Sequence, residues 1–174
     1  MKSYINLFPF LLICIAGCST TQQPSSLPTH TSTTVTKAKN QIISLKEVKQ
    51  NNKNIGDSVV KTAESLLGTP YKYGGTDPRG FDCSGLVYYS YLQSGIEIPR
   101  TTRQQANNTT PIDWQKLRPG DLLFFQTFGN DISHVGIYTG NDQFIHAPKS
   151  GKQVTHQQVD TYWKNRLIKT GRPH

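Results

Sequence analysis

The chain changes character near residue 55. From Ser19 to Asn54 it is rich in Ser, Thr, Gln, Asn and Lys and has no sustained apolar periodicity, which predicts a solvated tether. The remaining stretch, residues 55–174, therefore has to supply the whole hydrophobic core. Its length suits one domain of ordinary size and is too short for two.

Inside this domain, helical patterns come first and strand patterns follow. Apolar spacing predicts a helix over residues 56–67, and Asp82 is a good N-cap for a second helix that ends at Gly95. A short helical segment is expected around residues 102–107. Short apolar runs separated by turn residues then predict five strands, over residues 122–126, 134–139, 143–146, 153–157 and 166–169. This order indicates an α+β domain with its helices packed on a short-stranded antiparallel sheet.

The first residues have the pattern of an export signal. A basic start, an apolar run and small residues at 16 and 17 predict a secretory signal, and the run is shorter than the roughly 20 residues that span a bilayer. The sequence Ile15-Ala16-Gly17-Cys18 resembles the lipobox of bacterial lipoproteins, in which the Cys is lipidated and becomes the mature N-terminus. The resemblance implies a lipoprotein signal peptide over residues 1–17, and a lipidated Cys18 with a flexible polar tether over residues 18–54.

Lipid on Cys18 would hold the protein on a membrane face. Ser19, where an Asp would favour inner-membrane retention, implies the outer membrane, with the protein facing the periplasm. The net charge of +8 is divided, because the tether has five Lys and one Glu while the domain is nearly balanced. We therefore expect the basic character to serve attraction to the wall or membrane, with no nucleic-acid partner, and we expect a monomer.

Cysteine usage leaves one free thiol. Cys14 leaves with the signal and Cys18 is capped by lipid, so only Cys83 remains and no intramolecular disulfide can form. Cys83 follows the capping Asp82 and would lie in the first turn of a helix, where unpaired N–H groups and the macrodipole favour the thiolate. A lowered thiol pKa is the expectation, with an inert core cysteine as the alternative.

A thiol nucleophile needs a base and a group that orients the base. A three-residue loop at 140–142 would oppose residue 139 with residue 143, which places His134 and His146 on one face of the sheet as a diagonal pair, within reach of each other. A two-residue loop without a bulge would place them on opposite faces. The same two histidines with Cys83 could instead bind zinc, but no short ligand motif is present, so we expect no metal and no cofactor.

Several motifs together resemble the NlpC family of papain-like cell-wall cysteine peptidases, and the lipobox and short tether make the chain similar to the lipoprotein subgroup. They occur in the family's order and cover the chain from Gly56 onward: Tyr71-Lys72-Tyr73-Gly74-Gly75, Gly80-Phe81-Asp82-Cys83-Ser84-Gly85, Ile98-Pro99-Arg100-Thr101-Thr102, Pro119-Gly120-Asp121-Leu122, His134-Val135-Gly136-Ile137-Tyr138 and Phe144-Ile145-His146-Ala147.

The resemblance implies a role for each site residue. Cys83 matches the nucleophile, His134 the general base and later acid, and His146 the residue that orients His134. Tyr71 matches a tyrosine that helps the oxyanion together with the backbone N–H of Cys83. Asp82 and Ser84 match positions that contact the stem peptide. We expect structural roles for the other residues near the cleft and for both tryptophans: Tyr73, Arg100, Gln104, Gln105, Trp114 and Trp163.

The function that this resemblance implies is a peptidoglycan endopeptidase acting through an acyl-enzyme thioester. Its target is an amide in the stem peptides, either the D-glutamyl to diaminopimelate bond or the cross-link between diaminopimelate and D-Ala. An amidase or acyltransferase acting on lipids or small amides is one alternative. A non-catalytic wall-binding lipoprotein is another.

Overall fold

The computed structural model describes the backbone of residues 32–174 and the side chains of residues 41–51 and 55–174. The predicted signal peptide, the predicted lipidation site Cys18 and the first part of the predicted tether lie outside the described residues. Residues Lys39–His174 form one compact unit, which carries the sheet and the helices that pack on it. No helix within the described residues is long and apolar enough to cross a bilayer.

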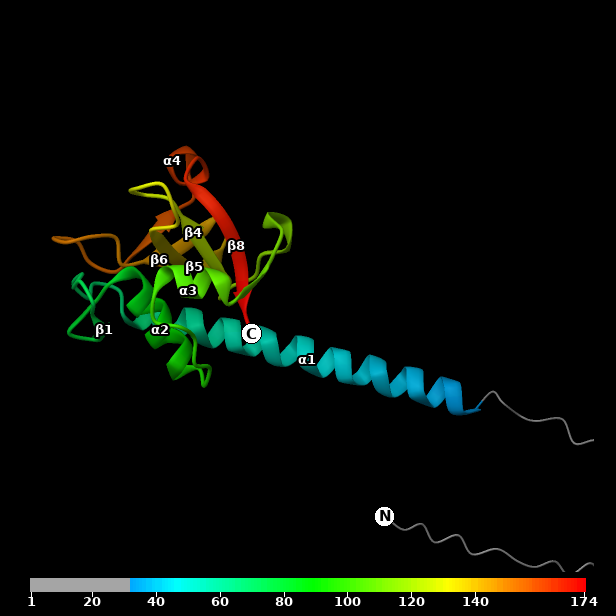
Figure 1. Ribbon diagram of the computed structural model, residues 1–174. Coiled ribbons are helices and arrows are strands. Elements are labelled where there is room, and N and C mark those ends of the chain that lie inside the picture. Colours follow the sequence, from blue (N-terminus) through cyan, green and yellow to red (C-terminus); the bar gives the residue numbers. More distant parts are fainter. Residues whose placement is uncertain (1–31) are drawn as a thin grey trace, which may run out of the picture. The chain divides into compact units, whose positions relative to one another are not determined.

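Helix α1 (Ser32–Ser65) begins well before the predicted start at Gly56 (Figure 1). The prediction of a non-helical tether is therefore wrong over residues 32–54. This segment contains no Gly or Pro, so nothing in it ends a helix that is anchored by packing further along the chain. The side chains of residues 41–51 are all exposed, and among the described side chains the first that is partly buried is Ile55, where the domain was predicted to start.

Helices α2 (Cys83–Gln93) and α3 (Thr102–Asn107) agree with the sequence-based prediction. Asp82 caps α2, since its carboxylate accepts the backbone N–H of Gly85, and the helix ends just before Gly95, which has φ +80°. That conformation is the left-handed one that glycine adopts at helix ends. Helix α3 covers the predicted residues and follows its N-cap, Thr101.

The six-stranded sheet is antiparallel throughout, with strand order β3-β8-β4-β5-β6-β7, and a separate pair is formed by β1 (Thr76–Asp77) and β2 (Gly80–Phe81). The sheet strands are β3 (Thr109–Pro111), β4 (Leu122–Phe125), β5 (His134–Gly140), β6 (Gln143–His146), β7 (Thr155–Gln158) and β8 (Leu167–Pro173). The five predicted strands correspond to β4 to β8, and the α+β prediction is confirmed. The sequence did not reveal β3, the 3-10 turn η1 (Trp114–Lys116) or the short helix α4 (Thr161–Lys164).

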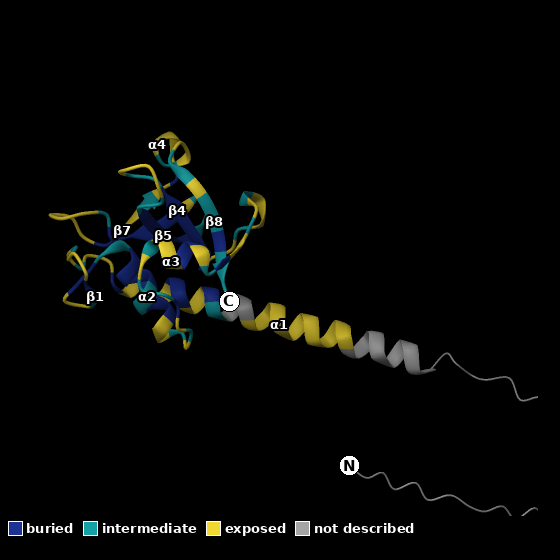
Figure 2. Ribbon diagram, viewed as in Figure 1, coloured by how far each residue is buried: buried dark blue, intermediate teal, exposed yellow. Residues whose placement is uncertain are grey.

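Each face of the sheet packs on its own hydrophobic cluster, and the buried centre is visible in Figure 2. Alternation along β4 shows the division, because Leu122 and Phe124 join α1 and α2 in the larger cluster while Leu123 and Phe125 join the smaller one. Leu123 and Phe125 share that smaller cluster with Tyr138 and Phe144. Helices α1 and α2 therefore cover one face, and residues of even number on β5 and β6 point to the other.

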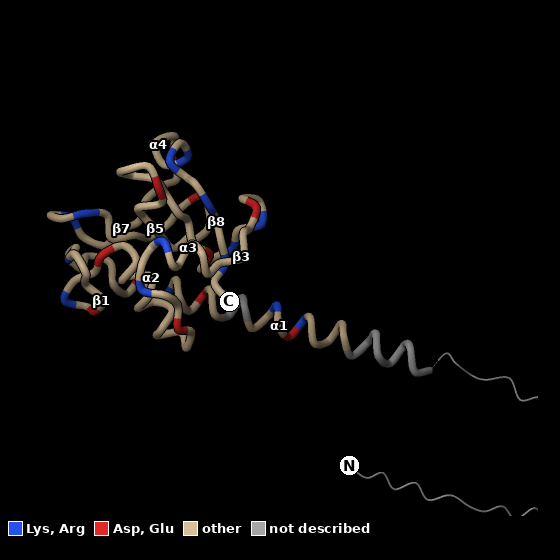
Figure 3. The backbone as a smooth tube through the Cα atoms, viewed as in Figure 1, with Lys and Arg blue, Asp and Glu red and all other residues tan. Residues whose placement is uncertain are grey.

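A buried ion pair fastens the last strand to the start of β4. The Asp121 side chain is only 2% exposed and accepts two hydrogen bonds of 2.7 Å from the guanidinium of Arg172, with a third from the backbone N–H of Arg118. Elsewhere in the domain acidic and basic residues are interspersed along the chain (Figure 3). The surface pair of Asp113 and Lys116 is typical, with both side chains largely exposed.

We expect Asp121→Ala to lower the free energy of unfolding by about 3 kcal/mol, because it leaves Arg172 partly buried without its counter-charge. Asp113→Ala removes the acidic partner of an exposed pair and is expected to leave stability almost unchanged. Urea denaturation of both variants measures the difference. Equal losses in the two proteins would contradict a structural role for the buried pair.

Candidate active site

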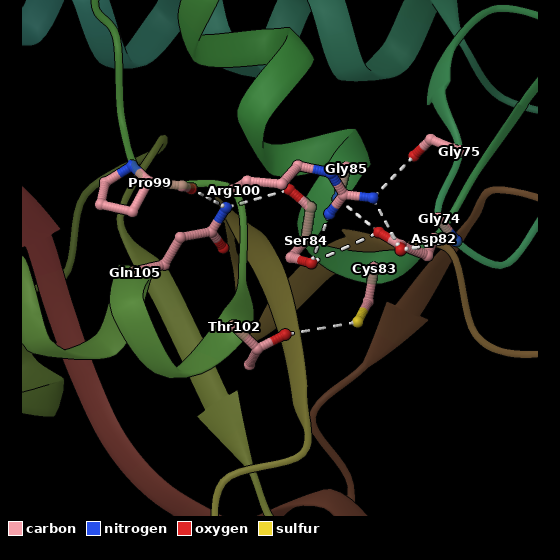
Figure 4. A network of polar contacts seen from close by, with 10 residues as sticks. All are labelled: Gly74, Gly75, Asp82, Cys83, Ser84, Gly85, Pro99, Arg100, Thr102 and Gln105. Carbon is pink, nitrogen blue, oxygen red and sulfur yellow. Dashed lines mark hydrogen bonds and ion pairs between the residues drawn. The ribbon is translucent and has the colours of Figure 1, made fainter.

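Cys83 is the first residue of α2, and Asp82 fixes its position. The Asp82 carboxylate accepts hydrogen bonds from four donors, which come from three segments of chain: the backbone N–H groups of Gly74 and Gly85, the hydroxyl of Ser84 and the guanidinium of Arg100 (Figure 4). A carboxylate with this many donors holds the turn before the helix rigidly. The stem-peptide contact implied for Asp82 and Ser84 stays a prediction.

The segment before and within α3 braces the start of α2, as predicted for Arg100 and Gln105. Arg100 donates to Ser84 Oγ at 2.9 Å and to Asp82 Oδ2 at 2.8 Å. Gln105 is buried, and its amide donates to the backbone carbonyls of Ser84 and Pro99. Gly85 has to be glycine, because a Cβ there would lie 1.9 Å from the carbonyl oxygen of Gly75.

The two histidines lie on one face of the sheet, and their rings are hydrogen-bonded to each other, with His134 Nε2 2.8 Å from His146 Nδ1. The prediction of a shared face is confirmed, although the loop differs from the expected one. The turn contains only Asn141 and Asp142, both with positive φ. One extra residue between Tyr138 and Gly140 bulges out of the pairing, and it keeps the two histidines on the same face.

This hydrogen bond determines which nitrogen of His134 can act as a base. His134 Nε2 is engaged with His146, so Nδ1 is the nitrogen left for the thiol. In the neutral tautomer that donates from Nε2, Nδ1 has a free lone pair and can accept a proton. His134 begins β5 and His146 ends β6, so both lie at the same end of this antiparallel strand pair, and helix α2 contacts β5. The backbone N–H of Val135, next to His134, favours the thiolate form of Cys83.

Trp163 packs against both histidines. Its ring centroid lies 5.7 Å from that of His134 and 5.2 Å from that of His146, and the same indole contacts Phe125 and Phe144. The expected packing role is thus correct, and the packing partners include the candidate base. No sequence signal pointed to these partners, because Trp163 comes from a four-residue helix far from either histidine in the chain.

Burial suppresses charge on the candidate base and on its partner. It lowers the pKa of His134 from 6.5 to about 4, and burial together with the neighbouring His134 lowers the pKa of His146 to about 3. Burial also raises the pKa of the Cys83 thiol, and Asp82 adds to this rise, while hydrogen bonds from Thr102 and from backbone N–H groups oppose it. The predicted lowering of the thiol pKa is therefore wrong, because burial outweighs the donors at the helix start.

Tyr71 lies close enough to Cys83 for the charge of the thiolate to affect the pKa of the Tyr71 phenol. Burial raises the pKa of the Tyr71 phenol, and the charges of Cys83 and Asp82 raise it further, which keeps the hydroxyl protonated and able to donate. A cavity of about 480 Å³ adjoins this side chain and is lined by Pro70, Tyr71, Gly151, Lys152 and Gln153. Tyr73, expected to pack, is instead 89% exposed.

A second cavity, of about 690 Å³, lies away from this site and contains none of its residues. It is bounded by the described part of α1, by Tyr91 and by the ion pair of Asp121 and Arg172. Among the described residues there is no group of three or more His, Cys, Asp and Glu side chains that could hold a metal ion. Cys83, the histidine pair and Tyr71 are the side chains from which the chemistry of the site is derived.

A cysteine at a helix start, with a histidine from an antiparallel sheet and a second polar residue on that histidine, is the arrangement of papain-like thiol hydrolases. Residues 68–172 match the NlpC/P60 family, and the chain belongs to that family. The family was thus identified correctly from the sequence motifs.

Several relatives show how far the similarity extends. The chain is 44% identical over 122 residues to the probable endopeptidase NlpC of Escherichia coli, covering 65% of this chain and 79% of the relative. It is 42% identical over 108 residues to the murein DD-endopeptidase MepH of the same organism, covering 59% of this chain but only 40% of the relative. The structure of the peptidoglycan hydrolase RipB from Mycobacterium tuberculosis superimposes with a TM-score of 0.62 at 30% identity, covering 71% of this chain and 66% of that chain.

The neutral resting state predicts how Cys83 reacts with iodoacetamide. With a raised thiol pKa and an uncharged His134, the alkylation rate should rise about tenfold per pH unit from pH 5 until it levels off above the pKa of about 8.5 of a free cysteine. The rate is measured on the whole protein, with Cys83→Ala as the background for other thiols. A plateau between pH 5 and 7 would show a preformed thiolate–imidazolium pair and would contradict this description.

Proposed function

We propose that this protein is a peptidoglycan endopeptidase that hydrolyses an amide bond of the stem peptides with Cys83 as nucleophile. The observation that carries the proposal is the hydrogen-bonded pair of His134 and His146, on strands β5 and β6 next to helix α2, within the region that matches the NlpC/P60 family. The chain spans only 40% and 27% of the first two curated relatives it resembles, so the activity of those whole proteins is here a proposal.

The geometry supports a two-step acyl transfer. His134 Nδ1 takes the proton of Cys83, and the sulfur attacks the carbonyl carbon while the π electrons move to the oxygen. The backbone N–H of Cys83 and the Tyr71 hydroxyl are the proposed donors to that oxyanion. His134 then protonates the leaving amine, and a thioester forms. Water, deprotonated by His134, hydrolyses the thioester and restores the thiol.

His146 acts on His134 through their hydrogen bond. By accepting the proton of His134 Nε2 it holds the imidazole in the tautomer that leaves Nδ1 unprotonated. The indole of Trp163 packs on both rings and limits their rotation. A base fixed in both tautomer and orientation needs little rearrangement when the substrate arrives.

Two bonds of the stem peptide are candidate targets, the D-glutamyl to diaminopimelate bond and the diaminopimelate to D-Ala cross-link. Similar proteins bear names of both kinds, a DD-endopeptidase from Escherichia coli and a bifunctional muramidase/DL-endopeptidase from Bacillus subtilis. Mass analysis of the products identifies the bond directly.

Digestion of purified peptidoglycan by the whole protein in detergent is the test. We expect the wild type to release muropeptides cut at one peptide bond, and Cys83→Ala and His134→Ala to release at least about 100-fold less. His156→Ala, an exposed histidine on β7, is the matched control and should keep wild-type activity. Equal release by wild type and Cys83→Ala would overturn the thiol mechanism, and transferred acyl groups in place of cut peptides would indicate an acyltransferase.

We further propose that lipid on Cys18 anchors the protein to the outer membrane, facing the periplasm. The lipobox at residues 15–18 and Ser19 support this, and one solved structure of similar fold, from Staphylococcus aureus, is described as similar to a lipoprotein. Several acyl chains on one Cys give firm anchoring.

The anchor can be tested in cells by fractionation and by labelling with a fatty-acid analogue. Wild-type protein should carry the label and sediment with outer membranes, and Cys18→Ala should carry no label. Cys83→Ala, which removes the other cysteine predicted to remain after processing, should still be labelled. Label on Cys18→Ala, or sedimentation of wild type with inner membranes, would contradict the proposal.

A further inference from the structure

A second hydroxyl lies against the candidate nucleophile. Thr102 Oγ1 is 3.6 Å from Cys83 Sγ, and Figure 4 shows the Thr102 side chain directed at the sulfur from α3. The contact joins residues 19 positions apart in the chain, on two different helices. Either atom can be the donor, so the same contact suits both a thiol and a thiolate.

The position of Thr102 is built into the packing of α3. Residues three apart on a helix share a face, and Gln105, three residues on, is buried and hydrogen-bonded to the backbone carbonyls of Ser84 and Pro99. The same face of α3 that is held against the start of α2 thus presents Thr102 to the sulfur. The next residue, Arg103, pairs at 2.8 Å with Asp131, in the loop that leads to His134.

The charges around the sulfur make a neutral donor valuable there. Asp82 opposes a thiolate, and the guanidinium of Arg100 is engaged with Asp82 and Ser84. Burial keeps His134 uncharged at neutral pH, and the Tyr71 hydroxyl is protonated. The groups that favour the thiolate are the backbone N–H groups of Val135 and Ser84 and the side chain of Thr102.

We propose that Thr102 is a catalytic residue. At rest its hydroxyl accepts a hydrogen bond from the Cys83 S–H, and during the reaction it donates a hydrogen bond to the Cys83 thiolate. The thiol proton goes to His134 Nδ1, and Thr102 rotates its own O–H toward the sulfur without giving up its proton. The sulfur electron pair then forms the bond to the carbonyl carbon. When the thioester is hydrolysed, the same O–H stabilises the departing thiolate until it is reprotonated by His134. The role rests on the proposed function of Cys83 as nucleophile.

The chain contains a matched control in the adjacent threonine. Thr101 is the N-cap of α3, and its hydroxyl donates to Gln104 at an exposed position. Thr102→Val and Thr101→Val are therefore the same chemical change at neighbouring positions, and only the first removes a hydroxyl that contacts the sulfur. Thr102→Ser keeps the hydroxyl.

The experiment is iodoacetamide alkylation of Cys83 in the whole protein from pH 5 to 11, which needs no peptidoglycan. We expect Thr102→Val to lower the rate at pH 7 about tenfold and to raise the midpoint of the profile by about one pH unit, as for loss of a hydrogen bond to a charged group. Thr102→Ser and Thr101→Val should follow the wild-type profile. Thr102→Ala repeats the test if the valine variant does not fold.

Turnover gives an independent readout. On soluble muropeptides, Thr102→Val should lower kcat about tenfold with KM unchanged, because the bond is strengthened only when the sulfur is charged. An unchanged alkylation profile in both Thr102→Val and Thr102→Ala would overturn the proposal. If the alkylation profile of Thr102→Val is shifted but the wild type does not cut peptidoglycan, the proposed substrate is overturned and the role of Thr102 at the thiol stands.

Discussion

The carboxylate of Asp82 is the contact on which the rest of the site depends. It lies where the loop before β1, the start of α2 and the segment before α3 meet, and it hydrogen-bonds to all three. A residue chosen only to cap a helix would need one of these bonds. The additional bonds connect three segments of chain through one carboxylate. The nucleophile, Arg100 and the loop that contains Gly74 are therefore held in fixed positions relative to one another. The same negative charge disfavours a thiolate at Cys83, and the site therefore relies on hydrogen-bond donors around the sulfur.

Burial of Cys83 and His134 keeps both side chains uncharged until the proton is transferred between them. Both partners of the proton transfer are neutral at rest, because the Cys83 pKa is raised and the His134 pKa is lowered. The thiolate–imidazolium pair then forms only during the reaction. Interactions that stabilise this pair lower the energy of the transition state more than that of the resting enzyme, and they therefore raise the rate. The smaller hydrophobic cluster contributes here, since Phe125, Phe144 and Trp163 are the surfaces that exclude water from the histidine rings.

Features governed by local rules could be predicted from the sequence, and features set by distant packing could not. The cap at Asp82, the end of α2 at Gly95 and the shared face of the histidines follow from turn chemistry and strand alternation. The pKa of Cys83 depends on how deeply the folded chain buries the sulfur, which no local pattern contains. The proximity of Trp163 to the histidines depends on the return of the chain through α4. Strand β3 has three residues, one of them Pro111, and pairs only because β8 lies beside it.

The irregular pairing in the β5–β6 hairpin limits how this part of the chain can change in length. The face on which His146 lies depends on one extra residue between Tyr138 and Gly140. Deleting that residue, or inserting one elsewhere in the hairpin without a compensating bulge, would turn His146 away from His134 together with the other side chains of β6. A change of two residues would preserve the pairing of the rings. Length variation at this tip therefore suits even steps, because an odd step removes the partner of the base and also moves Phe144 and Ile145 out of their own hydrophobic clusters.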